Sequence, residues 1–235
     1  MTAPKAYIFD VFGTLVDWRE SIAAQANALF ADAGIDVDGH AFADYWRGLY
    51  QPAMQRVRSG NRGYVALDIL HLENLDETLH HFGLADQFGT EARAIMNLFW
   101  ERLDPWPDVV EGLAALKETA IIAPCSNGSI ALMTRLAKHA NLPWDCILGA
   151  DIAQNYKPEP AVYTACCNAL RLEAGEVMMV AAHNDDLAAA RAGGLQTAFI
   201  ARPTEYGPHQ SKDFEPDADW DRVVPTIGAL AGSRP

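Results

Sequence analysis

Four short apolar runs, each followed by a turn or loop, constrain the fold of this 235-residue chain more than any other feature. Most of them precede an amphipathic segment with helical spacing. Strands that are buried on both faces read as continuous apolar runs, and strands that alternate with helices pair in parallel. We therefore predict an α/β fold whose core is a doubly wound, Rossmann-like parallel sheet. Its expected strands are Ala6 to Phe9, Ala120 to Ala123, Val177 to Ala182 and Thr197 to Ile200.

The stretch between the first and second runs has a different pattern. Apolar residues recur there at helical spacing without a strong strand signal, and Gly34 is placed to end the first helix. We predict an all-helical cap domain at residues 17–102, inserted into a catalytic core of residues 1–16 and 103–235. Ligands of open α/β sheets bind outside the carboxyl ends of the strands, so a cap at this point would cover the site and exclude water.

The amino-acid composition indicates which classes of binding partner are unfavourable for this chain. The formal net charge is −13 and the pI is about 4.8. An acidic surface repels phosphate backbones and anionic lipids, so we expect neither nucleic acid nor a membrane as partner. No apolar stretch approaches the roughly 18 residues of a membrane helix, and the N-terminus lacks the features of a signal peptide. The four cysteines form no CxxC pair, which is typical of free thiols in a reducing compartment. We therefore expect a cytoplasmic protein.

Four polar motifs carry the candidate chemistry. Asp10 ends the first run, and Thr14 follows it after a glycine turn. A carboxylate is ionised at neutral pH without an activating base, so it can attack carbon directly. The other motifs are Ser126-Asn127-Gly128, Lys157-Pro158-Glu159-Pro160-Ala161-Val162-Tyr163 and His183-Asn184-Asp185-Asp186. Each has a structural explanation when taken singly, as a turn, a helix cap or a solvated charge. Their order along the chain favours function.

The strings F-D-x-F-G-T-L-x-D, S-N-G and K-P-x-P-x-V-Y together resemble the motifs of the haloacid dehalogenase superfamily. Most members are phosphatases, with a second aspartate two residues after the nucleophile as acid and base. Here that position is Phe12, and an aromatic ring cannot move a proton. An aspartate that holds Mg²⁺ in the phosphatases is replaced by Ala182, which offers no oxygen ligand. The resemblance is therefore to the L-2-haloacid dehalogenases, which use no metal or organic cofactor.

This resemblance implies a role for each matching residue. It assigns catalysis to Asp10, Thr14, Lys157 and Asp186, and binding of substrate or halide to Val11, Phe12, Arg47, Ser126, Asn127, Tyr163 and His183. In the implied reaction, Asp10 attacks C2 of a short 2-haloalkanoate from behind, so an L-2-halo acid gives a D-2-hydroxy acid. Arg47 and Asn127 stabilise the departing halide, and Ser126 and Lys157 hold the carboxylate. Water then hydrolyses the aspartyl ester, aided by Asp186 and Lys157.

His183 departs from the family pattern, because relatives usually have asparagine there. A transition-metal site in the string His-Asn-Asp-Asp is the weaker interpretation, since adjacent residues seldom converge on one ion. An imidazole is bulkier than an amide and donates strongly to fluoride when protonated. We therefore expect His183 to contact the leaving halide, and we advance the hypothesis that the enzyme accepts fluoroacetate.

Several alternatives stay open. A Mg²⁺-dependent phosphatase and a catalytically silent binding module of the same fold are the competing functions. Arg56, Arg58 and Arg62 are rivals of Arg47 for the halide. The loop at residues 202–208 is assigned no chemistry. A homodimer is predicted from the family alone.

Overall fold

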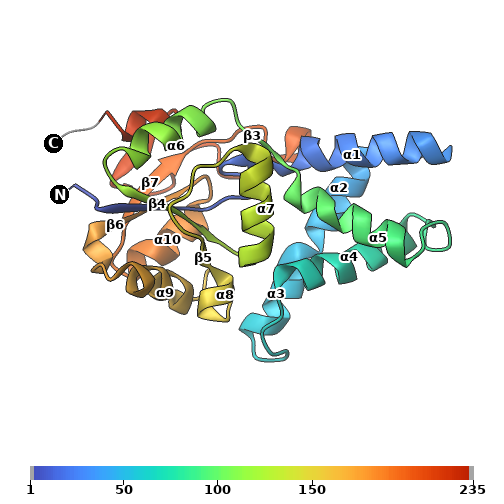
Figure 1. Cartoon of the computed structure of the whole chain (residues 1–235), viewed down its shortest axis with the longest axis horizontal. Helices are drawn as coiled ribbons and strands as arrows, with labels where there is room; N and C mark the ends of the chain where they lie inside the picture. The colour runs from blue at the N-terminus through green and yellow to red at the C-terminus, as the bar shows by residue number, and fades with distance from the viewer. Residues whose placement is uncertain (1–2, 233–235) are drawn as a thin grey trace.

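The computed structural model describes residues 3–232 and has at its centre a parallel sheet (Figure 1). Its strand order is β5-β4-β1-β6-β7-β8, and all its pairings are parallel. The strands are β1 Ala6–Phe9, β4 Ile121–Ser126, β5 Leu148–Gly149, β6 Val177–Ala181, β7 Gln196–Ile200 and β8 Arg222–Val224. The predicted doubly wound sheet is confirmed. None of the helices described at residues 3–232 has the length and apolar character to cross a membrane.

Alternate residues of the central strand enter two different hydrophobic cores. Tyr7 and Phe9 pack on one face of the sheet, while Ala6 and Ile8 pack on the other. All four are buried, as expected for a strand covered on both sides. The first face is covered by α6 Val109–Lys117, α7 Ile130–Ala140 and η4 Ile227–Leu230. The second is covered by α9 Pro160–Leu170 and α10 Asn184–Ala192.

The segment between β1 and β4 is helical, as the sequence predicts. Its helices are α1 Trp18–Ala33, α2 Gly39–Gly48, α3 Tyr50–Arg58, α4 Leu67–His81, α5 Thr90–Asn97 and η1 Leu98–Glu101. Gly34 ends α1 in the left-handed conformation, with φ of 67°. Figure 1 shows α1, α2, α4 and α5 on one side of the molecule, beyond the sheet. The division into a core and a cap with the bounds given above stays a proposal.

Two short strands close the neck of this insertion. Val16–Asp17 (β2) pairs antiparallel with Asp104–Pro105 (β3), so the chain leaves and re-enters the core at one place. A strand of two residues is too short to show an alternating hydrophobic pattern, so β2 and β3 were not predicted from the sequence. The remaining short elements are α8 Ala150–Ala153, η2 Ala174–Glu176 and η3 Gly207–His209.

Candidate active site

The predicted site residues gather at the carboxyl end of the central strands. β1 lies between β4 and β6, which is where the sheet reverses its winding. Loops after these strands diverge at such a point and leave a crevice. The crevice is a pocket lined by Asp10, Phe12, Arg47, Tyr50, Gln51, Asn127, Lys157, Pro158, His183, Asp185, Asp186, Tyr206 and Lys212. Residues from the core and from the helical insertion therefore share one site.

Asp10, directly after β1, is buried and surrounded by hydrogen-bond donors. Lys157 Nζ donates to its Oδ1 at 2.8 Å, and Thr14 Oγ1 donates to its Oδ2 at 2.7 Å. His183 Nδ1 lies 3.0 Å from the same Oδ2. Burial alone would raise the pKa of Asp10, but Lys157 and His183 outweigh it and hold the pKa far below its ordinary value. Asp10 is therefore an ionised carboxylate at neutral pH.

Lys157 joins the two acidic residues of the site. Its Nζ also donates to Asp186 Oδ2 at 2.5 Å, and Tyr163 donates its hydroxyl to Asp186 Oδ1. Burial is the largest effect on Asp186 and raises its pKa, whereas that of Asp10 is lowered. The two carboxyl groups thus differ in proton affinity, which favours Asp10 as nucleophile and Asp186 as proton acceptor. Tyr163 orients Asp186 and is not in the pocket lining.

In the S-N-G segment after β4, Asn127 and Ser126 make different contacts. Asn127 Oδ1 accepts the backbone N–H of Lys157 at 2.7 Å, and its side chain, which lines the pocket, is also hydrogen-bonded to Tyr50. Ser126 is fully buried, and its Oγ accepts the N–H of Gly128 at 3.0 Å. Ser126 does not line the pocket, so its predicted contact with the substrate carboxylate stays a prediction.

Arg47, from α2, brings a cation into the pocket from the helical insertion. Its guanidinium lies over the rings of Tyr50, 4.1 Å away, and Trp18, 5.2 Å away. Its Nη1 is buried and has no hydrogen-bond partner within residues 3–232. A buried donor without a partner is costly unless an anion satisfies it. Arg47 thus has a donor available in the pocket, and its predicted contact with the halide stays a prediction.

The rival arginines have other partners. Arg58 donates to the carbonyl of Lys157 at 2.9 Å and lies outside this pocket. Arg62 pairs with Glu73 at 2.6 Å, and Arg56 is exposed.

Phe12 is buried and lines the pocket, with its ring edge-to-face against Tyr50 and Trp100. It makes the pocket wall apolar where a phosphatase would hold its acid. Val11, also buried, uses its carbonyl to accept the N–H groups of Leu15 and Val16. Val11 thus closes the loop after β1 and is not in the pocket lining.

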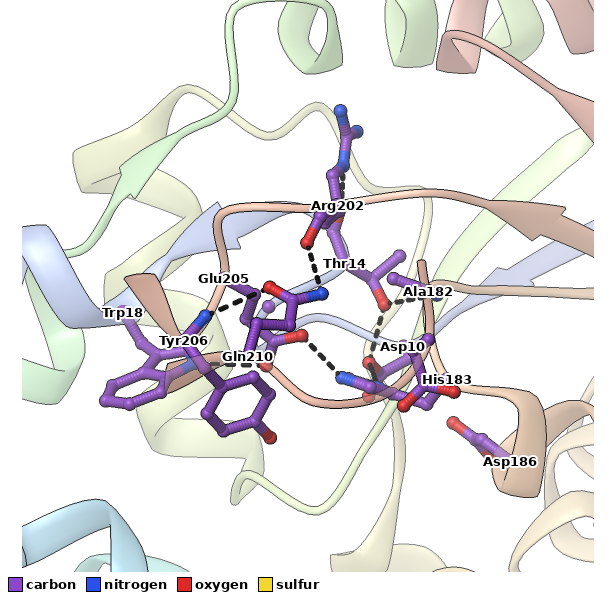
Figure 2. A network of polar contacts seen from close by, with 12 residues as sticks. Asp10, Thr14, Trp18, Ala182, His183, Asp186, Arg202, Glu205, Tyr206 and Gln210 are labelled. Atoms are coloured by element: carbon purple, nitrogen blue, oxygen red, sulfur yellow. Dashed lines mark hydrogen bonds and ion pairs between the residues drawn. The ribbon is translucent and has the colours of Figure 1, made fainter. Parts of the chain in front are cut away.

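His183 lies in the pocket, between the nucleophile and a second carboxylate. Its Nδ1 contacts the nucleophile, and its Nε2 lies 2.9 Å from Glu205 Oε2 (Figure 2). Backside attack sends the halide away from Asp10, whereas His183 stands beside the attacking carboxylate. His183 lines the pocket, and its expected contact with the leaving halide stays a prediction. The pKa of His183 is raised well above its ordinary value, because Glu205 and Asp10 outweigh the opposing effect of burial.

The sequence analysis missed the contribution of the loop at residues 202–208. Glu205 is 1% exposed and pairs with His183, and Tyr206 lines the pocket. The loop, to which the sequence analysis assigned no chemistry, thus contacts the site. The available signal was a carboxylate in the loop that follows strand 197–200, at the sheet edge where ligands bind. Tyr50, one turn after Arg47, was missed because helical spacing alone does not separate a pocket residue from a core residue.

Ala182 stands at the position where the resemblance places a magnesium ligand of the phosphatases. Ala182 contributes only its N–H, which Thr14 Oγ1 accepts at 2.9 Å. In the part of the chain that the structure describes, no group of three or more His, Cys, Asp and Glu side chains could hold a metal ion. Cys125 is buried, 3.5 Å from Cys166 through their sulfur atoms, and its pKa is raised by this contact and by burial. Cys125 is thus an unreactive thiol.

Comparisons with known proteins agree with this geometry. The family model of the haloacid dehalogenase-like hydrolases matches residues 4–194. The (S)-2-haloacid dehalogenase 4A of Burkholderia cepacia is 31% identical over 208 residues, which are 86% of each chain. The crystal structure of a defluorinating L-2-haloacid dehalogenase is 47% identical, with a TM-score of 0.95, over 97% of this chain and 94% of that one. A second L-2-haloacid dehalogenase structure is also 47% identical, with a TM-score of 0.94, over 97% of both chains.

Phosphatases are more distant relatives. The phosphoglycolate phosphatase of Thiobacillus denitrificans is 23% identical over 231 residues, 97% of this chain and 94% of that protein.

Proposed function

The chain belongs to the haloacid dehalogenase-like hydrolases, among the L-2-haloacid dehalogenases, and we propose that it hydrolyses the carbon–halogen bond of short 2-haloalkanoic acids. The observation that carries this proposal is the combination of Asp10 and Phe12. Asp10 is an ionised nucleophile held by Lys157, and the residue two positions later cannot protonate a leaving group. A halide needs no proton to leave, whereas the alcohol of a phosphate ester does.

In the first step Asp10 attacks C2, and the carbon–halogen electron pair departs with the halide. Arg47 and Asn127 line the pocket with donors for the developing anion. Attack from behind inverts C2, so an L-2-halo acid gives the D-2-hydroxy acid. The cationic side of the pocket, with Lys157, holds the substrate carboxylate.

In the second step water attacks the carbonyl carbon of the Asp10 ester. Asp186 takes the proton of water, because burial gives it the higher proton affinity of the two carboxyl groups. Lys157 contacts both Asp186 and Asp10, so it can pass a proton to the departing hydroxy acid. The displacement thus becomes two steps through a covalent ester.

Halide release tests this proposal. Chloroacetate, fluoroacetate and L-2-chloropropionate are incubated with the protein at neutral pH in EDTA, and free halide is measured. We expect catalytic chloride release that the variant Asp10→Asn lacks, by on the order of 10⁴-fold or more, as for loss of a covalent nucleophile. Phosphate release from phosphoglycolate with Mg²⁺, without halide release from any 2-haloacid, would instead make the protein a phosphatase. Halide release that survives Asp10→Asn would reject the assigned nucleophile.

We include fluoroacetate among the proposed substrates. Its support is the 47% identity to a relative described as defluorinating and the unpartnered donor of Arg47 within residues 3–232. Fluoride binds hydrogen-bond donors strongly, and Arg47 stays charged at all relevant pH values. Release of chloride without fluoride would restrict the substrates to the heavier halogens.

Three further proposals concern the domain organisation, the compartment and the oligomeric state of the protein. We propose that residues 17–102 are a cap domain over the core, that the protein acts in the cytoplasm, and that it forms a homodimer. The free cysteines, Cys125, Cys146, Cys166 and Cys167, support a reducing compartment. The substrate is a small molecule, and the acidic charge disfavours nucleic acid.

A further inference from the structure

The two oxygens of Asp10 have different surroundings. Oδ2 accepts from Thr14 Oγ1 at 2.7 Å and faces His183 Nδ1 at 3.0 Å. Oδ1 accepts a single hydrogen bond, from Lys157, among the contacts of residues 3–232. Each carboxylate oxygen has two in-plane lone pairs. Both lone pairs of Oδ2 are occupied, whereas Oδ1 keeps one free.

This difference decides which oxygen attacks. If the function proposed above holds, Oδ1 forms the bond to C2, because only it has an unoccupied lone pair. Oδ2 then becomes the carbonyl oxygen of the ester, and it carries the negative charge when water adds to Cγ. We propose that Thr14 and His183 form the oxyanion hole for hydrolysis of the Asp10 ester, and that Glu205 positions His183 for this role.

Thr14 is arranged to donate in one direction only. Its Oγ1 accepts the N–H of Ala182 at 2.9 Å (Figure 2). A hydroxyl has one proton, and the acceptor contact with Ala182 turns that proton toward Asp10 Oδ2. The side chain of residue 182 plays no part in this contact, so an alanine serves the oxyanion hole although it cannot bind a metal.

His183 donates from both ring nitrogens. Its two partners, Asp10 Oδ2 and Glu205 Oε2, are carboxylate oxygens, which only accept. The ring is therefore an imidazolium, and its positive charge lies against the atom on which negative charge develops. Such a preorganised donor stabilises the transition state without reorganisation. After the ester forms, Asp10 is neutral and Glu205 remains as the counter-charge of His183.

Glu205 is built into the fold for this task. It is 1% exposed, and its Oε1 accepts from Trp18 Nε1 at 3.1 Å, at the start of α1. Gly13 makes the space: a Cβ there would lie 2.1 Å from Glu205 Oε1, and its φ of +88° favours glycine. The first loop of the core, the first helix of the insertion and the loop 202–208 thus hold one buried carboxylate behind His183.

The second step hydrolyses the Asp10 ester. The oxygen of water bonds to Cγ, its proton goes to Asp186, and the carbonyl π pair moves onto Oδ2, where Thr14 and His183 stabilise it. The pair then returns, the bond between Cγ and Oδ1 breaks, and Oδ1 leaves with C2 as the hydroxy acid. Its proton comes from Lys157, which Asp186 reprotonates. Asp10 is left as the acid with one oxygen from water, and it loses the second proton of that water to solvent, which restores the carboxylate.

Rapid mixing separates the two steps. Chloroacetate, in excess over the enzyme, is mixed with it rapidly. Released halide is followed in the first turnover and in the steady state. The intact mass of the protein measures the fraction of Asp10 that is esterified. In Thr14→Val, we expect a halide burst of one equivalent, accumulation of the ester, and turnover slowed by about 10²–10³-fold, the usual effect of losing one oxyanion donor. Thr14→Ser keeps the hydroxyl and is the matched control; it should turn over without ester accumulation.

Glu205→Gln keeps the shape behind His183 and removes the charge. We expect the same burst and ester accumulation, with a smaller loss of turnover than in Thr14→Val, because the imidazole can still donate as a neutral ring. A merely structural role would lower the fraction of active enzyme without trapping the ester.

Two results would overturn the inference. One is a slowed halide burst with no ester in Thr14→Val and Glu205→Gln, which would place both residues in the first step. The other is unchanged turnover in both. Failure of the proposed function is a different result, since wild-type enzyme would then release no halide from any 2-haloacid tested.

Discussion

At the scale of single residues, the proposed role of Arg47 can be tested directly. Its Nη1 is buried without a partner within residues 3–232, so the halide would supply the missing acceptor. Arg47→Met keeps the length of the side chain and removes the charge. We expect kcat for chloroacetate to fall by about 10²–10³-fold, because the donor acts where charge develops. Steady-state chloride release measures this loss.

Arg56→Met is the matched control, since Arg56 is an exposed arginine of the neighbouring α3. Its kcat should stay near that of the wild type. Equal losses in the two variants would mean that positive charge acts generally and that Arg47 is not the halide ligand.

His183 should make the free energy of unfolding fall as the pH rises. Its charged neighbours are Asp10 and Glu205, and Lys157 and Asp186 lie beyond Asp10. The folded pKa of His183 is raised well above its unfolded value of about 6.5. A group of this kind stabilises fully below the unfolded pKa, and the stability is lost as pH rises through the folded pKa.

We therefore expect the free energy of unfolding to be steady below about pH 6.5 and to fall as the pH rises from there toward the folded pKa. Glu205→Gln removes the largest of the effects that raise this pKa, so it should lower the folded pKa and end the fall at a lower pH. Urea unfolding from pH 6 to 9 compares the two proteins. Parallel pH profiles would show that Glu205 does not set the charge of His183.

Sequence reasoning found the site residues whose identity is set by motif. Asp10, Lys157 and Asp186 follow strands or precede a helix at recognisable spacing, and the structure brings them together. It missed Glu205 and the contact of Glu205 with His183. Those two residues are 22 positions apart, and only the return path of the loop after β7 decides that they meet.

At the scale of elements, long apolar runs were predictable and two- or three-residue strands were not. β1 was predicted with the bounds observed, whereas β5 and β8 were missed. A run of four buried residues has a pattern, and a two-residue bridge owes its pairing to its neighbours. β4 extends to Ser126, beyond its predicted end, and this carries the S-N-G segment to the site.

Close packing of α6 on η4 gives a prediction at this scale. Gly112 lies inside α6, where alanine is ordinarily the better helix former. A Cβ at this position would lie 2.6 Å from the backbone nitrogen of Gly228 and 2.8 Å from Cβ of Ile227. We expect Gly112→Ala to destabilise the protein by about 1–3 kcal/mol, the usual cost of overpacking. Urea denaturation measures the difference.

Gly48→Ala is the matched control, because it is also a helical glycine and a Cβ there meets no atom within 4 Å. It should leave stability unchanged or raise it by about 0.5–1 kcal/mol. Destabilisation by both substitutions would point to helix backbone effects and away from the α6–η4 contact.

At the scale of the whole molecule, the helical insertion is fastened to the core around the pocket. Arg58 donates to the carbonyl of Lys157 at 2.9 Å, and Tyr64 donates to Asp151 Oδ1 at 2.5 Å. Asp151 in turn accepts the N–H of Ile130, at the start of α7. These contacts hold the apolar wall of the insertion over Asp10, and they shield the ester from bulk water. The sequence predicts the helices and leaves this docking open, because single polar contacts have no period.

The molecule as a whole is negatively charged, whereas its pocket contains the cations Arg47 and Lys157. A formal net charge of −13 on a sphere with a radius of about 20 Å repels a monoanion at the surface by roughly 2.7 kcal/mol without salt. Screening over a Debye length of ~8 Å at 0.15 M removes most of this repulsion. Of the pocket cations, Lys157 is buried and Arg47 is half-buried, so they attract the substrate only at short range. The repulsion should therefore control capture of a 2-haloacid.

We expect kcat/KM for chloroacetate to rise several-fold as sodium sulfate, a salt without halide, is raised from low concentration to physiological ionic strength, with kcat little changed. Lys212 stands at the pocket rim with its side chain 61% exposed, and it offsets part of the repulsion. Lys212→Gln should lower kcat/KM at low salt and steepen the rise. A fall of kcat/KM with salt in the wild type would mean that the pocket cations attract substrate beyond the pocket and outweigh the acidic surface. In that case Lys212→Gln should flatten the dependence, so the sign of the slope and the response of this variant together decide which field the substrate meets first.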